Sequence, residues 1–132
     1  MKRIVLTTFA LFGLLVLGGS LWPSGNTTAA SRRESAVVEF AETVKLGGVL
    51  LRGEYLIVHD EERMARGEAC TYIYRGKEID ESKLVTSFHC IHVERDKATA
   101  FKASFTRRTT PYETLEITEF QFAGSKDGHK VP

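Results

Sequence analysis

Cysteine, proline and tryptophan are scarce in this 132-residue chain, which contains two, three and one of them. An excess of charge of one sign is also missing, since 18 basic side chains face 17 acidic ones. This balance excludes a protein that binds nucleic acid through its phosphates, because such binding needs a basic surplus. The chain also lacks the C-x-x-C-H signature of covalent haem, a glycine-rich phosphate loop and a G-x-S-x-G serine setting. We therefore predict no catalytic residue and no cofactor.

The first thirty residues are typical of a secretory signal peptide. Residues 1–3 form a short basic stretch, residues 4–17 are almost wholly apolar, and small residues lead up to Ala30. No cysteine precedes Cys70, which excludes a lipid-modified cysteine at the cleavage site. We expect a periplasmic or secreted protein. The alternative is an uncleaved membrane anchor over residues 4–22, which approaches the roughly 20 residues that span a bilayer.

The remainder of the chain predicts a single all-β domain. We expect a flexible lead-in over residues 31–36, a β-domain over residues 37–123 and a loose polar tail over residues 124–132. Short runs of β-branched and aromatic residues alternate with polar ones and are separated by turn residues, and no segment makes a convincing helix. Five to six such strands predict a small antiparallel meander that forms a sandwich or a barrel.

Three local features refine this expectation. The segment Val49–His59 is the clearest strand, and its alternation places apolar side chains on both faces. Gly47 and Gly48 before it predict a tight turn. The segment Leu115–Phe122 changes phase between its first and second halves, which predicts a bulge near Thr118.

The stretch from Cys70 to Cys90 reads as one β-hairpin with a polar turn. If the turn centres on Asp80, Cys70 lies opposite Cys90 and Tyr72 opposite Phe88. Cysteines that face each other across antiparallel strands are within the distance that a disulfide tolerates. Export would favour oxidation, so we predict a disulfide between Cys70 and Cys90. The alternatives are two buried free thiols or metal ligands.

Two histidines fall near these cysteines when the strands are laid out. If the strand that ends at His59 pairs with the one that starts at Cys70, then the residues at one end of the sheet are His59, Cys70, Cys90 and His92. Imidazoles and thiolates are preferred zinc ligands, but C-x19-C-x-H is no standard zinc pattern and oxidation would remove the thiols. A metal site compatible with the disulfide would use His59 and His92 together with the loop carboxylates Asp60, Glu61 and Glu62.

The polar loop after His59 is the best candidate for a partner-facing surface, since recognition tends to sit on long polar loops of a rigid sheet. The residues singled out are Asp60, Glu61, Glu62, Arg63 and Arg66. Their charges can equally pair among themselves. We expect the partner to be an unknown protein or a surface component, with membrane contact only if the N-terminal segment is uncleaved.

The stretch LLRGEYLIVHD resembles the L-x-x-G-x-Y strand start of small exported β-proteins. GEACTYIY and FHCIHVER resemble uncharacterised small secreted all-β proteins of bacteria. The resemblance spans Val44 to Phe122 and implies fold and compartment, but no activity and no functional residue. We therefore expect a non-enzymatic exported β-domain that acts as a binding or structural module of the periplasm or cell surface. The alternatives are a metal-binding protein that uses His59 and His92, and a hydrolase whose site carries no known signature.

Overall fold

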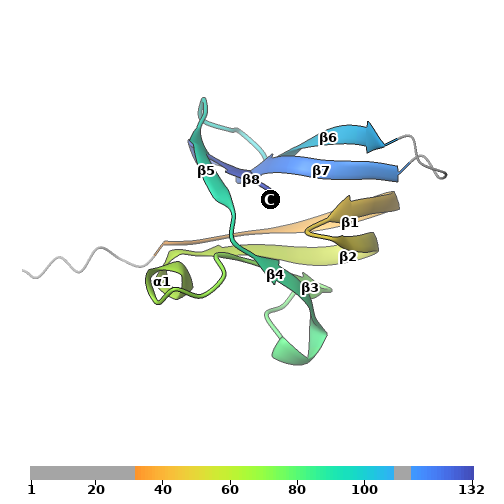
Figure 1. Ribbon diagram of the computed structural model, residues 1–132, viewed down its shortest axis with the longest axis horizontal. Coiled ribbons are helices and arrows are strands. Elements are labelled where there is room, and N and C mark those ends of the chain that lie inside the picture. The colour runs from red at the N-terminus through yellow and green to blue at the C-terminus, as the bar shows by residue number, and fades with distance from the viewer. Residues whose placement is uncertain (1–31, 109–113) are drawn as a thin grey trace, which may run out of the picture.

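The computed structural model describes residues 32–108 and 114–132. Within these ranges the chain forms eight strands, one short α-helix and one 3-10 helix (Figure 1). The strands are β1 (Arg33–Leu46), β2 (Val49–Asp60), β3 (Thr71–Arg75), β4 (Leu84–Phe88), β5 (Ile91–Glu94), β6 (Lys102–Arg108), β7 (Thr114–Gln121) and β8 (Asp127–Lys130), and the helices are α1 (Glu61–Ala65) and η1 (Glu81–Lys83). The predicted all-β class is confirmed, with more strands than the five to six expected.

The strands form one curled sheet with the shape of a half-barrel. Its order is β4-β3-β2-β1-β7-β8-β5, and β6 pairs with β7 outside this path. Strands β1 to β4 make one half and β5 to β8 the other, which lie below and above the core in Figure 1. The halves are joined by a parallel pairing of β1 with β7 over two residue pairs, Val44 with Leu115 and Lys45 with Glu116. This parallel junction distinguishes the fold from the simple antiparallel meander that was predicted.

Gly47 and Gly48 form the predicted turn between β1 and β2. Their φ angles are +57° and +86°, and positive φ at both positions is what a two-residue I′ hairpin turn requires. The ring of Phe88 lies directly over Gly47, where an added Cβ would come within 2.6 Å of a ring carbon. The turn is therefore closed on one side by an aromatic side chain from β4.

The alternation in β2 sorts its side chains onto two covered faces, as predicted. Tyr55 and Ile57 point into the main core, which the two halves of the sheet share. Leu56 and Val58 point outward and form a second cluster. The other members of that cluster are Tyr72, Tyr74 and Ala69.

The predicted bulge in β7 is confirmed. Ser104 of β6 pairs with Glu119 and Phe105 with Ile117, so Thr118 has no partner in the ladder. The extra residue shifts the alternation of side chains between the two faces of the strand by one position. As a result Ile117 and Phe120 are buried in the same core, although they are an odd number of residues apart.

The predicted β3–β4 hairpin exists, but its register differs by one residue. Thr71 pairs with Phe88 and Tyr72 with Ser87, where we expected Tyr72 to face Phe88. The turn contains η1, capped by the Asp80 side chain, and an irregularity interrupts the pairing after Ile73. A slip of one residue exchanges the faces, so Phe88 packs on the main core while Tyr72 lies in the outer cluster.

Both predicted flexible ends of the domain contain strand. Residues 33–36 belong to β1 and not to a flexible lead-in. The tail 124–132 is not loose, because β8 pairs with β5 and with β7 and carries the buried His129. The sequence of β8, DGHK, has no apolar alternation, and its place is set by the strands on either side.

The predicted signal peptide, with the alternative anchor over residues 4–22, lies outside the described residues. Both stay predictions about the N-terminal segment. Among the helices of residues 32–108 and 114–132, none combines the length and the apolar character needed to cross a membrane.

Candidate metal centre

Three imidazoles and one thiol converge at one end of the half-barrel. They belong to His59 near the end of β2, Cys90 between β4 and β5, His92 in β5 and His129 in β8. One possible ligand atom from each residue lies within 4.8 Å of those from the other three. The ring centroids of His59 and His129 are 4.4 Å apart, and the His92 centroid lies 5.0 Å from each.

Strand pairing and the core explain this convergence. His92 lies directly opposite His129 in the β5–β8 ladder, so their side chains project from the same face. On the other edge of β8, Phe120 is the partner of His129, and its ring stacks on the imidazole with centroids 5.2 Å apart. His59 reaches the same place from the inward face of β2, two residues after the buried Ile57.

The two innermost histidines lack the hydrogen bonds that buried polar groups normally make. His59 and His129 are both 0% exposed. Among the described residues, no hydrogen bond of good geometry reaches either ring nitrogen of His59 or Nε2 of His129. Beside Cys90, whose effect is larger, His59 lies close enough to Cys70 to lower the pKa of that thiol. A buried polar group without a partner costs on the order of 1–3 kcal/mol. A cation held by the nitrogen lone pairs would remove part of this cost.

Burial keeps His129 in the neutral form that a metal requires. Its pKa is lowered to about 4, first because burial disfavours the charged ring and then because His59 and His92 lie beside it. A neutral imidazole offers a lone pair to a metal, whereas an imidazolium does not. His129 can therefore act as a ligand at neutral pH.

Cys90 belongs to this cluster and Cys70 lies beside it, and both are free thiols. Their sulfurs are 2.6 Å apart, whereas a disulfide bond measures about 2.05 Å. The backbone N–H of Cys90 donates to the sulfur of Cys70 at 2.9 Å. The contact between the sulfurs lowers the pKa of Cys70 and raises that of Cys90. The predicted proximity of the sulfurs is found, but the predicted disulfide is not supported.

The sulfur of Cys90 is placed among the imidazoles. It lies 3.5 Å from Nδ1 of His129 and 3.8 Å from Nε2 of His92. In a tetrahedral zinc site, a sulfur and a nitrogen ligand are about 3.6 Å apart, given bonds of about 2.3 Å and 2.0–2.1 Å. Both sulfur–nitrogen distances are therefore close to the distance between two ligands of one ion. The other nitrogen of His129 is 3.7 Å from the Glu34 carboxylate, a group of the kind that orients metal-bound imidazoles.

The donor set and its exposure define what the site can do. Three nitrogens and one sulfur suit zinc and copper, because imidazole and thiolate are preferred ligands of both. His59 and His129 lie on the buried side of the site, while His92 is exposed and Cys90 is half-buried. An ion can therefore reach the site from solvent.

The structure brings together the two predicted histidine ligands, His59 and His92, but not the predicted carboxylates. The cluster does not include Asp60, Glu61 or Glu62. Asp60 follows His59 and therefore points to the opposite face of β2, where its carboxylate accepts hydrogen bonds from the backbone N–H groups of Glu62 and Arg63 at the start of α1. His129 was not predicted, because its strand was read as a loose tail.

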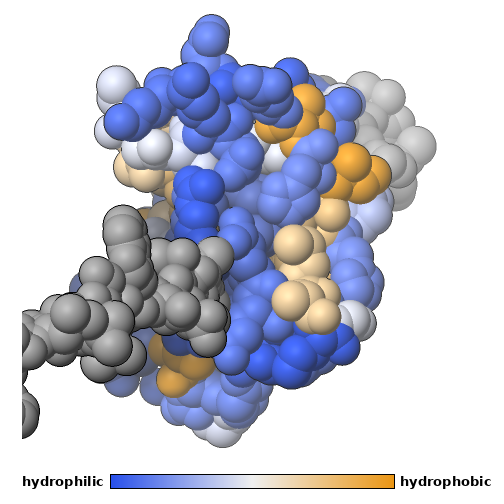
Figure 2. All heavy atoms as spheres, turned by 90° about the vertical axis from the view of Figure 1, so that its left-hand side faces the viewer, coloured by the Kyte–Doolittle hydropathy of each residue, from blue (hydrophilic) through white to orange (hydrophobic). Residues whose placement is uncertain are grey.

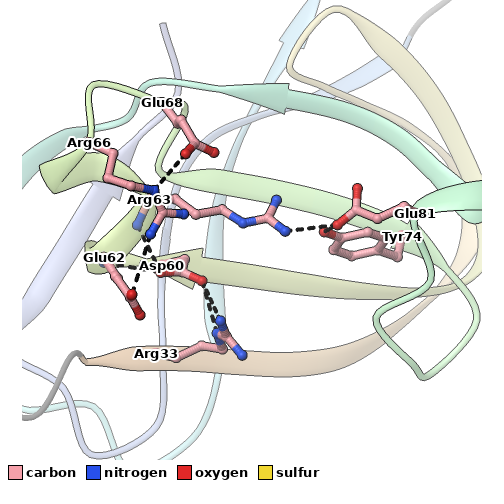
Figure 3. Close-up of polar contacts among 8 residues, drawn as sticks. All are labelled: Arg33, Asp60, Glu62, Arg63, Arg66, Glu68, Tyr74 and Glu81. Carbon is pink, nitrogen blue, oxygen red and sulfur yellow. Dashed lines mark hydrogen bonds and ion pairs between the residues drawn. The ribbon is translucent and has the colours of Figure 1, made fainter.

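The segment predicted to face a partner contains α1, and its charges pair with neighbouring side chains (Figure 3). The ion pairs drawn there join Arg33 to Asp60, Arg63 to Glu81, and Arg66 to both Glu62 and Glu68. The Arg63 guanidinium also lies 4.3 Å from the centre of the Tyr72 ring. These contacts tie α1 to the outer cluster of the sheet, while partner binding through this segment stays a prediction.

The surface at the end that carries β5 and α1 is mainly hydrophilic. Figure 2 shows apolar side chains there only as small separate patches on the part of the chain that is coloured. Such a surface suits solvent access to a polar site better than the docking of a partner through an extended apolar surface.

Comparison of the chain with protein-family models, with curated proteins and with solved structures finds no match, so its function is inferred from the side chains themselves.

Proposed function

We propose that the protein binds a zinc- or copper-type ion through His59, Cys90, His92 and His129. The supporting observation is that two fully buried imidazoles lie 4.4 Å apart and that three of their four ring nitrogens lack a hydrogen bond of good geometry among the described residues. A core that served only stability would fill such positions with apolar or hydrogen-bonded side chains. The proposal keeps two of the expected ligands and replaces the loop carboxylates with Cys90 and His129.

We propose binding and not catalysis at this centre. Four protein donors complete a tetrahedral shell, whereas catalytic zinc sites keep one position open for water or substrate. The exposure of His92 supports an ion that exchanges with solvent. The signal-like N-terminus supports a periplasmic or secreted location, and the broader role as a partner-binding module stays a prediction.

The test is metal titration of the purified protein under reducing conditions. Zn²⁺ and Cu⁺ are added in separate arms against a competing chromophoric chelator, and one equivalent of the preferred ion should bind. His92→Ala removes an exposed ligand, so the fold should survive while the affinity falls about a hundredfold or more. His89→Ala is the matched control, because His89 is an exposed histidine of the same segment outside the cluster.

His89→Ala should bind the ion as the wild type does. The proposal fails if neither Zn²⁺ nor Cu⁺ binds to the reduced wild-type protein. It also fails if His92→Ala and the wild type bind with equal affinity.

A further inference from the structure

We propose that the thiol state of Cys70 and Cys90 controls the metal centre, so that a disulfide between them and a bound ion exclude each other. This inference rests on the proposed function and adds a regulation to it. The disulfide expected from the sequence would then be the oxidised state of two cysteines that are free thiols in the structure.

One atom, the sulfur of Cys90, carries the inference. It touches the sulfur of Cys70 on one side and faces the nitrogens of His129 and His92 on the other. The group of four possible ligands contains Cys90 and not Cys70. A thiolate is a strong ligand for zinc, whereas a disulfide sulfur has no negative charge to offer. Cys90 can therefore serve the ion or the disulfide, but not both.

The oxidation step needs a partner disulfide, for which glutathione disulfide is a suitable small-molecule oxidant. The Cys90 thiol loses its proton to solvent, and its sulfur then attacks one sulfur of glutathione disulfide, forms a mixed disulfide and releases one glutathione thiolate, which takes up a proton. The Cys70 thiolate then attacks the Cys90 sulfur and releases the second glutathione. Two electrons pass from the cysteine pair to the oxidant, and the two thiol protons end on the two glutathione molecules.

Exposure decides which of the two cysteines reacts with the oxidant first. Cys70 is only 1% exposed, while Cys90 is half-buried and lies beside the exposed His92. A bound ion would occupy the Cys90 sulfur and shield it from the oxidant. Because the coupling of two equilibria is reciprocal, oxidation should weaken metal binding to the same extent that metal binding disfavours oxidation.

The experiment compares Zn²⁺ affinity of the purified protein in three forms. These are the reduced wild type, the wild type oxidised with glutathione disulfide, and Cys70→Ser kept reduced. Intact mass with and without alkylation confirms the oxidised form, which should be about 2 Da lighter and inert to alkylation. Oxidation should lower the affinity about a hundredfold or more, and added reductant should restore it. Cys70→Ser should bind Zn²⁺ within about threefold of the reduced wild type, since it keeps all four ligands.

The outcomes separate the two proposals. If the reduced wild type does not bind Zn²⁺ or Cu⁺, the proposed function itself fails. If the reduced protein binds and the oxidised protein binds equally well, the metal centre stands and the redox control is overturned. The comparison of the two wild-type forms decides this even if Cys70→Ser does not fold.

Discussion

Substitution of Gly47 by alanine should destabilise the protein much more than substitution of its neighbour Gly48. Both glycines have positive φ, and a side chain in that region costs about 1–2 kcal/mol in either position. They differ in their surroundings. A Cβ on Gly47 would lie 2.6 and 2.7 Å from two ring carbons of Phe88, whereas a Cβ on Gly48 meets nothing within 4 Å.

The ring of Phe88 would have to move by about 1 Å to reach an ordinary carbon contact of 3.5–4.0 Å. Phe88 packs on the main core, and overpacking of this kind costs about 1–3 kcal/mol more. We therefore expect Gly48→Ala to lose about 1–2 kcal/mol of unfolding free energy and Gly47→Ala about 2–5 kcal/mol. Urea unfolding of both variants and the wild type measures the difference at a shared m-value. Equal losses in the two variants would refute the packing of β4 against the β1–β2 turn.

Two further predictions concern the metal and one carboxylate. Zn²⁺ at about a hundred times its dissociation constant should raise the unfolding free energy of the reduced protein by about 2.7 kcal/mol. A chelator should reverse this gain. If His92→Ala shows the same gain at the same Zn²⁺ concentration, the result argues against the site. Burial raises the pKa of Asp60, but hydrogen bonds from the Arg63 backbone and the Arg33 guanidinium outweigh it, so the net pKa is lowered. Its stabilising effect is thus full above the unfolded pKa of about 3.9 and is lost as the pH falls through the lower folded value. Asp60→Asn should then cost about 1 kcal/mol at pH 7 and much less near pH 2 in urea unfolding, while the exposed Asp80→Asn should cost less at pH 7.

Much of the fold follows from local patterns in the sequence. The alternation in β2 sorts its apolar side chains correctly because each face has its own cluster to pack against. The paired glycines predict the first turn because few other residues adopt positive φ. The phase change in β7 predicts the bulge at Thr118, since only an extra residue lets Ile117 and Phe120 share a core.

Other features depend on contacts that no local pattern encodes. The register of β3 and β4 is set by a 3-10 turn and an irregularity, and the sequence does not distinguish it from a pairing shifted by one residue. Strand β8 has four residues and no apolar alternation, so only its neighbours β5 and β7 reveal it. His129 was missed for this reason.

The candidate site was predictable in part. His59 and His92 were placed together because the strand ends that carry them meet at one end of a sheet. The role of Cys90 was set aside because export was expected to oxidise it. In the structure Cys90 belongs to the site, since its sulfur lies near the imidazoles of His129 and His92 as well as near Cys70.

The four-residue cluster lies across the two halves of the sheet, which are joined by little backbone pairing. Backbone pairing joins β1 to β7 over only two residue pairs. His59 belongs to one half, whereas His92 and His129 belong to the other. An ion bound by all three histidines would therefore cross-link the two halves at one end of the half-barrel, in addition to the core that the halves share.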